Sequence, residues 1–152
     1  MSTPLTSPPA GTPLPRWAAR LGYAGLIPFV ALAAAAWLAS AEYRAQTAFA
    51  LLAYGATIAS FLGAIHWGLA MRGPLTPQPG PFVWGVFPSL VAWVALLLPL
   101  SQGLVTMAML LGICLAVDRR SYPAYGLGEW LGMRLHLTAV AALCMLAGSL
   151  AT

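Results

Sequence analysis

Five long apolar segments alternate with short polar or proline-rich stretches along the chain. They cover residues 21–40, 46–71, 82–100, 103–118 and 132–151. A bilayer core of about 30 Å requires about 20 helical residues. Four segments reach that length, whereas the fourth is short enough to be a buried helix instead. The pattern predicts an all-α, polytopic membrane bundle of about five transmembrane helices.

The stretches outside these segments predict connections. Residues 1–18 hold five prolines and predict a disordered tail, which leaves residues 19–152 for the helical bundle. Residues 73–81 hold four prolines and predict a rigid, irregular connection. Residues 121–131 contain aromatic side chains such as Tyr122, which suits a loop anchored at the membrane interface.

Composition supports a membrane location. The chain is 61% hydrophobic and only 7% charged, whereas soluble domains carry roughly a quarter charged residues. Most of its surface must therefore face lipid. The net charge of +4 does not indicate nucleic-acid binding, because the cations do not cluster with aromatic residues in a polar segment.

The arginines predict the orientation of the bundle. If all five segments span the bilayer, Arg44 lies alone on one side. The other side holds Arg16, Arg20, Arg72, Arg119, Arg120 and Arg134. Cytoplasmic loops are enriched in Lys and Arg, so we expect a cytoplasmic N-terminus and a periplasmic C-terminus.

One feature competes with this topology. Residues 39–41 (Ala-Ser-Ala) follow an apolar run and resemble a signal-peptidase site. The run is longer than a usual signal core and contains Pro28. We therefore expect a retained helix, with cleavage at Ala41 as the alternative.

Small residues follow one face of the second segment at helical spacing. Such residues let helix backbones approach closely, which drives association in lipid. We predict that this segment is the central helix. The predicted packing positions are Gly55, Ala59 and Gly63, with an adjacent stripe of Ala56, Ser60, Ala64 and Gly68.

Ionisable side chains inside a membrane are costly and are therefore functional candidates. Four of them, His66, Asp118, Arg134 and His136, are predicted at similar depth in the cytoplasmic half. His66 extends the small-residue face and should point inward, with Asp118, Arg134, His136 or a backbone carbonyl as its partner. Residues two apart on a helix differ by about 200°, so at most one of Arg134 and His136 faces the interior.

These residues permit a structural interpretation and several functional ones. In the structural interpretation, Asp118 and the arginines pair and His66 bonds between helices. In one functional interpretation, His66, Trp67, Tyr23 and Arg134 line a quinone or lipid head-group site. In another, His66 and His136 ligate haem b. A proton or solute pathway is disfavoured, because the outer half of the segments is almost purely apolar.

No catalytic set and no metal site are predicted. Cys114 and Cys144 lie within apolar runs, where cysteine acts as a small hydrophobic residue. No Cys/His cluster with metal-ligand spacing is present in the sequence.

The block Ser60–Gly63 followed by His66-Trp67-Gly68, together with residues 133–138 (MRLHLT), resembles a known family. It is the family of small bacterial and mitochondrial membrane proteins of unknown function that includes transmembrane protein 69 of animals. The resemblance covers about residues 20–148, and Ala64 stands where a second glycine is expected. It implies a bacterial inner-membrane protein in which His66, Trp67 and Arg134 matter.

We predict a non-enzymatic function from these observations. The small size, lipid-compatible surface and small-residue stripes favour an accessory, assembly or stabilising subunit that contacts lipid and other membrane subunits. The alternative is a binder of quinone, haem or lipid at the polar layer of the cytoplasmic half.

Overall fold

The computed structural model describes residues 14–72 and 79–152, and all of its regular elements there are helical. The elements are α1 (Arg16–Ala24), α2 (Leu26–Leu38), α3 (Ala41–Met71), α4 (Pro79–Leu97), α5 (Leu100–Ser121), the 3₁₀ helix η1 (Tyr122–Tyr125) and α6 (Trp130–Leu150).

Five helical stretches are long and apolar enough to cross a membrane, with α1 and α2 together forming the first. The predicted all-α bundle of five transmembrane helices is therefore confirmed. The short fourth segment is part of the 22-residue helix α5, because its helical ends extend beyond the purely apolar run. Orientation in the membrane remains a prediction.

Two predicted boundaries are wrong. The helix α1 begins at Arg16, so the last residues of the predicted tail 1–18 are helical. The helix α4 begins at Pro79, inside the predicted irregular connection 73–81. Proline is tolerated in a first helical turn, where its missing N–H costs no helical hydrogen bond. The rest of both predictions, residues 1–13 and 73–78, lies outside the described residues.

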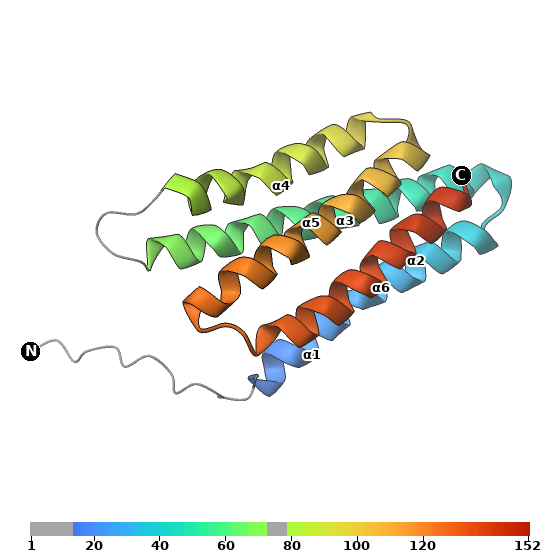
Figure 1. Cartoon of the computed structure of the whole chain (residues 1–152). Helices are drawn as coiled ribbons and strands as arrows, with labels where there is room; N and C mark the ends of the chain where they lie inside the picture. Colours follow the sequence, from blue (N-terminus) through green and yellow to red (C-terminus); the bar gives the residue numbers. More distant parts are fainter. Residues whose placement is uncertain (1–13, 73–78) are drawn as a thin grey trace, which may run out of the picture.

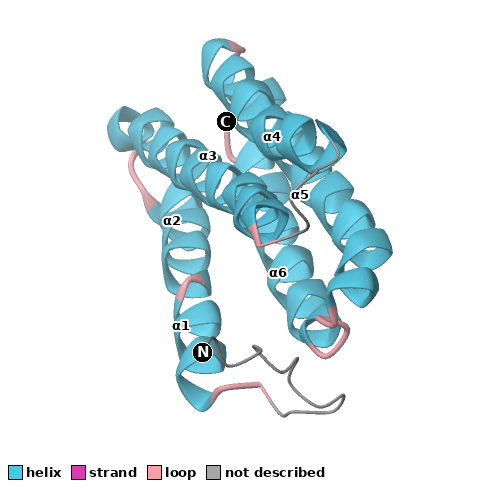
Figure 2. Cartoon of the chain, turned by 90° about the vertical axis from the view of Figure 1, so that its left-hand side faces the viewer, coloured by secondary structure: helices cyan, strands magenta, loops and turns pink. Residues whose placement is uncertain are grey.

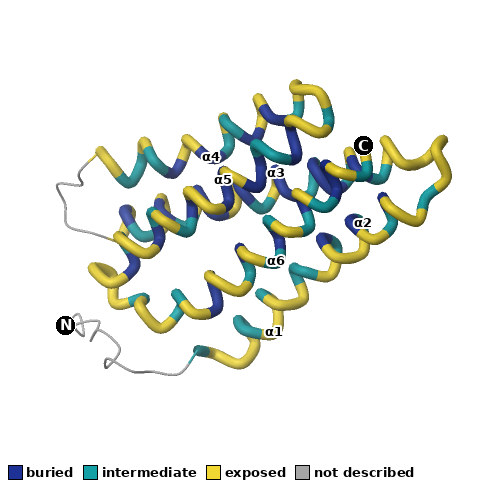
Figure 3. Tube along the Cα trace, turned by 45° about the vertical axis from the view of Figure 1, so that its right-hand side comes forward, coloured by how far each residue is buried: buried dark blue, intermediate teal, exposed yellow. Residues whose placement is uncertain are grey.

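The helix α3 is the centre of the bundle. It packs against α2, α4, α5 and α6, while α6 also packs against α2 and α5 (Figure 1). Buried positions concentrate on α3 and α5, whereas α4 and the α1–α2 pair expose most of their length (Figure 3). The exposed surface is rich in large apolar side chains, as expected where lipid is the solvent.

Glycines allow the closest contacts. A Cβ added to Gly63 would collide with the backbone carbonyl of Gly85 on α4, and one added to Gly55 would collide with Met145 on α6. Gly55, Ala59 and Gly63 are all buried, in agreement with the predicted stripe, and so is Ala56.

The rest of the adjacent stripe was predicted wrongly. Ser60, Ala64 and Gly68 are exposed, and nothing lies within 4 Å of a Cβ added to Gly68. A helix as long as α3 has more small-residue surface than its four neighbours cover. These three positions are therefore not packing residues within this chain.

The first span is broken at Gly25, three residues before Pro28, and is joined to the bundle there. Tyr54 Oη donates a hydrogen bond to the Gly25 carbonyl oxygen at 2.9 Å. The Tyr54 ring also packs edge-on against Phe29, with 4.9 Å between ring centroids. Further along, Trp37 Nε1 donates to the Ala147 carbonyl at 3.0 Å. These contacts make α2 an integral part of the bundle.

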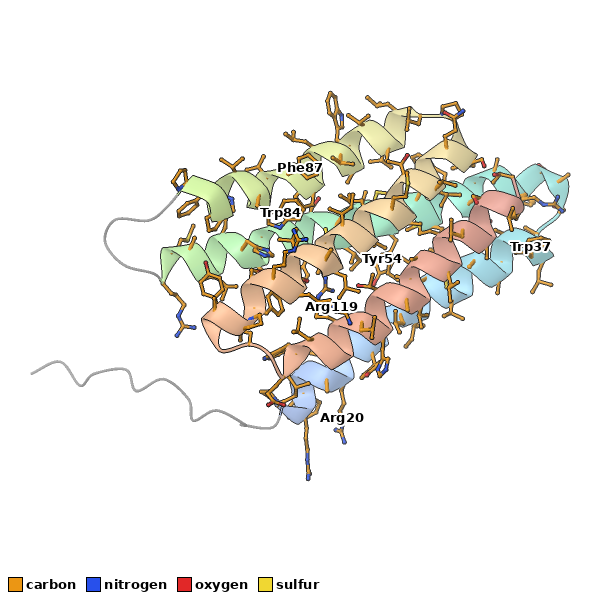
Figure 4. All side chains as sticks on the ribbon, viewed as in Figure 1. Arg20, Trp37, Tyr54, Trp84, Phe87 and Arg119 are labelled. Carbon is orange, nitrogen blue, oxygen red and sulfur yellow. The ribbon has the colours of Figure 1, made fainter. Side chains whose placement is uncertain are left out.

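Most arginines gather at one end of the bundle. The start of α1, the end of α3, the end of α5 and the start of α6 all lie there, on the left in Figure 1. Figure 4 shows Arg20 and Arg119 toward this end and Trp37 toward the other, where the connection between α2 and α3 lies. The sequence predicted six arginines on one side and Arg44 on the other. In the structure, the same two groups lie at opposite ends of the bundle.

Candidate functional site

Three ionisable side chains from three helices meet inside the arginine-rich half of the bundle. His66 comes from α3, Asp118 from the last turn of α5 and Arg134 from the first turns of α6. They are 3%, 1% and 7% exposed, respectively. We call these residues the His–Asp–Arg cluster. Tertiary structure, rather than chain proximity, brings His66 to the other two.

Arg134 and Asp118 form a buried ion pair. Arg134 Nε donates a hydrogen bond to Asp118 Oδ2 at 2.8 Å. Arg134 Nη2 lies 2.7 Å from the same oxygen, but its N–H groups are not directed along a hydrogen bond to it. Within the bundle each charge compensates the other, and loss of either would leave an unpaired charge in a low-dielectric interior.

His66 makes only long polar contacts. Its Nδ1 lies 3.4 Å from the Leu62 carbonyl oxygen. Its Nε2 lies 3.3 Å from Ser121 Oγ and 3.6 Å from Asp118 Oδ1. Asp118 is one of the partners expected for His66, while Ser121 was not anticipated. Among the described residues, His66 makes no direct polar contact with Arg134 or His136.

Ser121, His66 and Asp118 have the residue types of a catalytic triad, but their geometry differs from one. In a triad, the serine and the aspartate bind opposite nitrogens of the imidazole. Here both approach Nε2, and the Ser121 hydroxyl donates to the Val117 carbonyl at 2.9 Å. The imidazole is therefore not placed to take a proton from Ser121 and pass charge to Asp118.

A cavity of about 400 Å³ lies beside the cluster, bounded by α1, α2, α3 and α6 with contributions from α5 and η1. Its wall is mostly apolar. Arg134 belongs to this wall, whereas His66 and Asp118 do not. The cluster thus reaches the cavity through the guanidinium group.

Thr138 is a buried polar residue of the cavity wall whose hydroxyl has no hydrogen-bond partner among the described residues. It lies one turn from Arg134 on α6 and is only 6% exposed. Most buried polar groups in folded proteins are hydrogen-bonded, and an unpaired one costs about 1–3 kcal/mol. Arg134 Nη2 is held in the ion pair with Asp118, but its N–H groups make no well-directed hydrogen bond. The Thr138 hydroxyl and the guanidinium N–H groups that Asp118 does not accept can both donate.

The cavity wall reaches the outer surface of the bundle. It includes Leu21 on α1 and Phe61 on α3, which are 70% and 63% exposed. Figure 2 shows α1 and α3 standing apart at the end of the bundle that faces the viewer.

The remaining sequence candidates lie elsewhere. Trp67 Nε1 donates to the Phe82 carbonyl at 2.8 Å and packs against α4. Tyr23 Oη lies 3.3 Å from His136 Nδ1, and His136 is exposed. Arg134 alone of the pair on α6 faces inward, as helical geometry predicted. None of these three side chains lines the cavity.

This placement separates the two histidines. His66 is buried against Asp118, whereas His136 lies on the outer surface beside Tyr23. A bis-histidine haem site needs both imidazoles to face one cavity, so the haem b interpretation of this pair is wrong. Within the described ranges, moreover, no three His, Cys, Asp or Glu side chains form a group able to hold a metal ion.

Two residues of the site escaped the sequence analysis. Tyr122 was assigned to an interfacial loop, but it is 3% exposed, lines the cavity and lies 6.2 Å from the His66 ring. Tyr122 directly follows α5 and begins η1, which ends at Gly126 in the left-handed conformation at φ 69°. The one sequence signal for Thr138 as a site residue is that it follows Arg134 by four positions, which places both on the same helix face.

Comparison with known proteins places the chain among uncharacterised membrane proteins. Transmembrane protein 69 of Xenopus tropicalis is 38% identical over 140 residues, 90% of this chain and 54% of the frog protein. Transmembrane protein 69 of Mus musculus is 33% identical over 115 residues, 73% of this chain and 46% of the mouse protein. The chain thus spans about half the length of these relatives. No solved structure matches it. A family described as "Protein of unknown function (DUF3429)" matches residues 14–150, and the chain therefore belongs to this family of multi-pass membrane proteins.

Proposed function

We propose that this protein binds a membrane-dissolved amphiphile, such as a quinone or lipid, in the cavity beside the His–Asp–Arg cluster. One observation carries the proposal: Thr138, whose buried hydroxyl has no partner among the described residues, lies beside the ion-paired Arg134 in the wall of a mostly apolar cavity. Small-molecule sites combine an apolar wall with a few polar groups that fix orientation, in volumes of about 300–1,000 Å³.

The supporting argument is energetic. Lipid tails cannot satisfy the Thr138 hydroxyl or the free guanidinium N–H groups. A ligand head group with an acceptor oxygen satisfies them, and its tail replaces lipid against the apolar wall. The His–Asp–Arg cluster then holds the guanidinium in place, because the Asp118 carboxylate fixes its Nε side.

Filling the cavity tests this proposal. We expect Ala18→Phe to lower the amount of co-purifying quinone or lipid, measured by mass spectrometry of protein in native-lipid nanodiscs, because Ala18 lines the cavity. Ala19→Phe is the matched control, since Ala19 is similarly half-buried on the same helix but does not line it. An unchanged or absent ligand complement in all three proteins would refute the binding function.

The accessory-subunit role is a second candidate. The exposed Ser60, Ala64 and Gly68 of α3, with a shallow groove between α3 and α4, offer close approach to a transmembrane helix of another protein. A photo-crosslinking residue at position 64 should then capture one defined membrane protein, whereas the same residue at the lipid-exposed position 90 should not. Equal, diffuse labelling from both positions would remove this candidate.

We also propose a bacterial inner-membrane location with the arginine-rich end in the cytoplasm. The asymmetry of arginines between the two ends supports it. A reporter fused after Thr152 should be active only if it functions in the periplasm. Cytoplasmic activity of that fusion would reject this orientation.

A further inference from the structure

If the binding function proposed above is correct, the chemistry of the cavity wall restricts which ligand head groups the cavity can bind. Two polar residues of the cavity wall, Arg134 and Thr138, are able to donate hydrogen bonds. The Thr138 hydroxyl has no partner among the described residues, and the N–H groups of the ion-paired Arg134 Nη2 make no well-directed hydrogen bond. They lie one helical turn apart on the same face of α6. A single acceptor oxygen with two lone pairs can accept from both.

Charge balance restricts the head group further. The Arg134 guanidinium is already paired with the Asp118 carboxylate, so the pair has no net charge. Among the residues that the structure describes, Arg134 is the one cation of the cavity wall. An anionic head group would therefore be buried without a compensating charge. An uncharged ligand leaves the charge balance of the Arg134–Asp118 pair intact.

We infer that the cavity selects an amphiphile whose head group is an uncharged carbonyl compound, held by Arg134 and Thr138. The carbonyl belongs either to a quinone ring or to the ester of a neutral glycerolipid. Both share an acceptor oxygen, and both carry a tail that suits the apolar wall, which includes the exposed side chains of Leu21 and Phe61.

The test compares four probes of similar tail length on the protein in nanodiscs, by equilibrium binding. They are decyl-ubiquinone, monodecanoyl glycerol, decylbenzene (which has no carbonyl) and decanesulfonate (which is permanently anionic). We expect at least one carbonyl probe to bind more tightly than decylbenzene and decanesulfonate. Which carbonyl probe wins distinguishes the quinone from the ester.

Thr138→Val then isolates the head-group contact. Valine keeps the shape of threonine and removes its hydroxyl, so we expect the carbonyl probe to bind roughly two- to tenfold more weakly and decylbenzene to bind unchanged. Thermal denaturation of the variant confirms that it is folded. Arg134→Lys, which keeps the charge but not the planar guanidinium, should weaken the same probe.

The failures are distinguishable. If all four probes bind equally and Thr138→Val changes none of them, the head-group inference is wrong but the cavity still binds amphiphiles. Tightest binding of decanesulfonate would also overturn it, in favour of an anion site. If no probe binds to wild type or competes with the native lipid, the proposed function fails together with the inference.

Discussion

The two sides of α3 differ in how they meet their neighbours. Toward α4, Gly63 lies against the Gly85 backbone, and the helices touch main chain to main chain. Toward α1, the large side chains Phe61 and Ile65 face a cavity. Small residues in lipid permit close contact, whereas large ones hold helices apart. The difference suggests that the α3–α4 side provides stability and the α1 side provides space for a ligand.

We expect the largest effect from a substitution that disrupts the close contact between α3 and α4. Gly63→Leu should abolish accumulation of folded protein in membranes, because even a Cβ at this position collides with the Gly85 carbonyl oxygen. Gly68→Leu on the same helix is the control, since a Cβ there has open space. Normal accumulation and melting of Gly63→Leu would show that α3 and α4 do not touch as described.

The next prediction distinguishes the electrostatic contribution of the Asp118–Arg134 pair from that of side-chain packing. Asp118→Ala should lower the free energy of unfolding by about 3–5 kcal/mol, because it strands the buried Arg134 charge. Replacing both partners, in Asp118→Leu with Arg134→Met, should recover much of that loss in chemical denaturation. A double variant no more stable than Asp118→Ala would indicate that the pair is not an isolated electrostatic unit.

A smaller effect is expected at His66. His66→Ala should destabilise the bundle by about 1–3 kcal/mol, because it opens a gap beside Asp118 and removes the contacts to Leu62 and Ser121. His136→Ala should change thermal stability far less, since His136 is exposed. If His66→Ala melts like wild type while the bound amphiphile disappears, His66 acts on the ligand rather than on folding.

We expect the smallest effect at the cavity, where a substitution should raise the stability of the protein rather than lower it. Thr138→Val should raise the stability of ligand-free protein by up to about 1 kcal/mol, because it removes a buried hydroxyl that has no partner. Thr57→Val should not be stabilising, since the Thr57 hydroxyl already donates to the Tyr54 carbonyl at 2.7 Å. A destabilised Thr138→Val would mean that the hydroxyl is satisfied in the empty protein.

The sequence by itself determined the class of fold. Apolar length predicts spans because lipid leaves the backbone no hydrogen-bond partner except itself, and this local rule needs no knowledge of neighbours. The same reasoning correctly predicted a buried Gly63 and that at most one of Arg134 and His136 faces inward, because helical periodicity fixes which residues share a face. It also predicted that His66, Asp118 and Arg134 lie at a similar depth in the bundle.

Only the tertiary structure decided which faces meet. Periodicity relates residues within one helix but not the rotation of one helix against another. It therefore could not distinguish the covered stripe of Gly55 and Gly63 from the exposed Ser60 and Ala64. For the same reason it allowed a pairing of His66 with a distant His136 and missed Tyr122. The cavity lies where α1 packs against α2 and α6 rather than closely against α3, an arrangement set by the packing of several helices together.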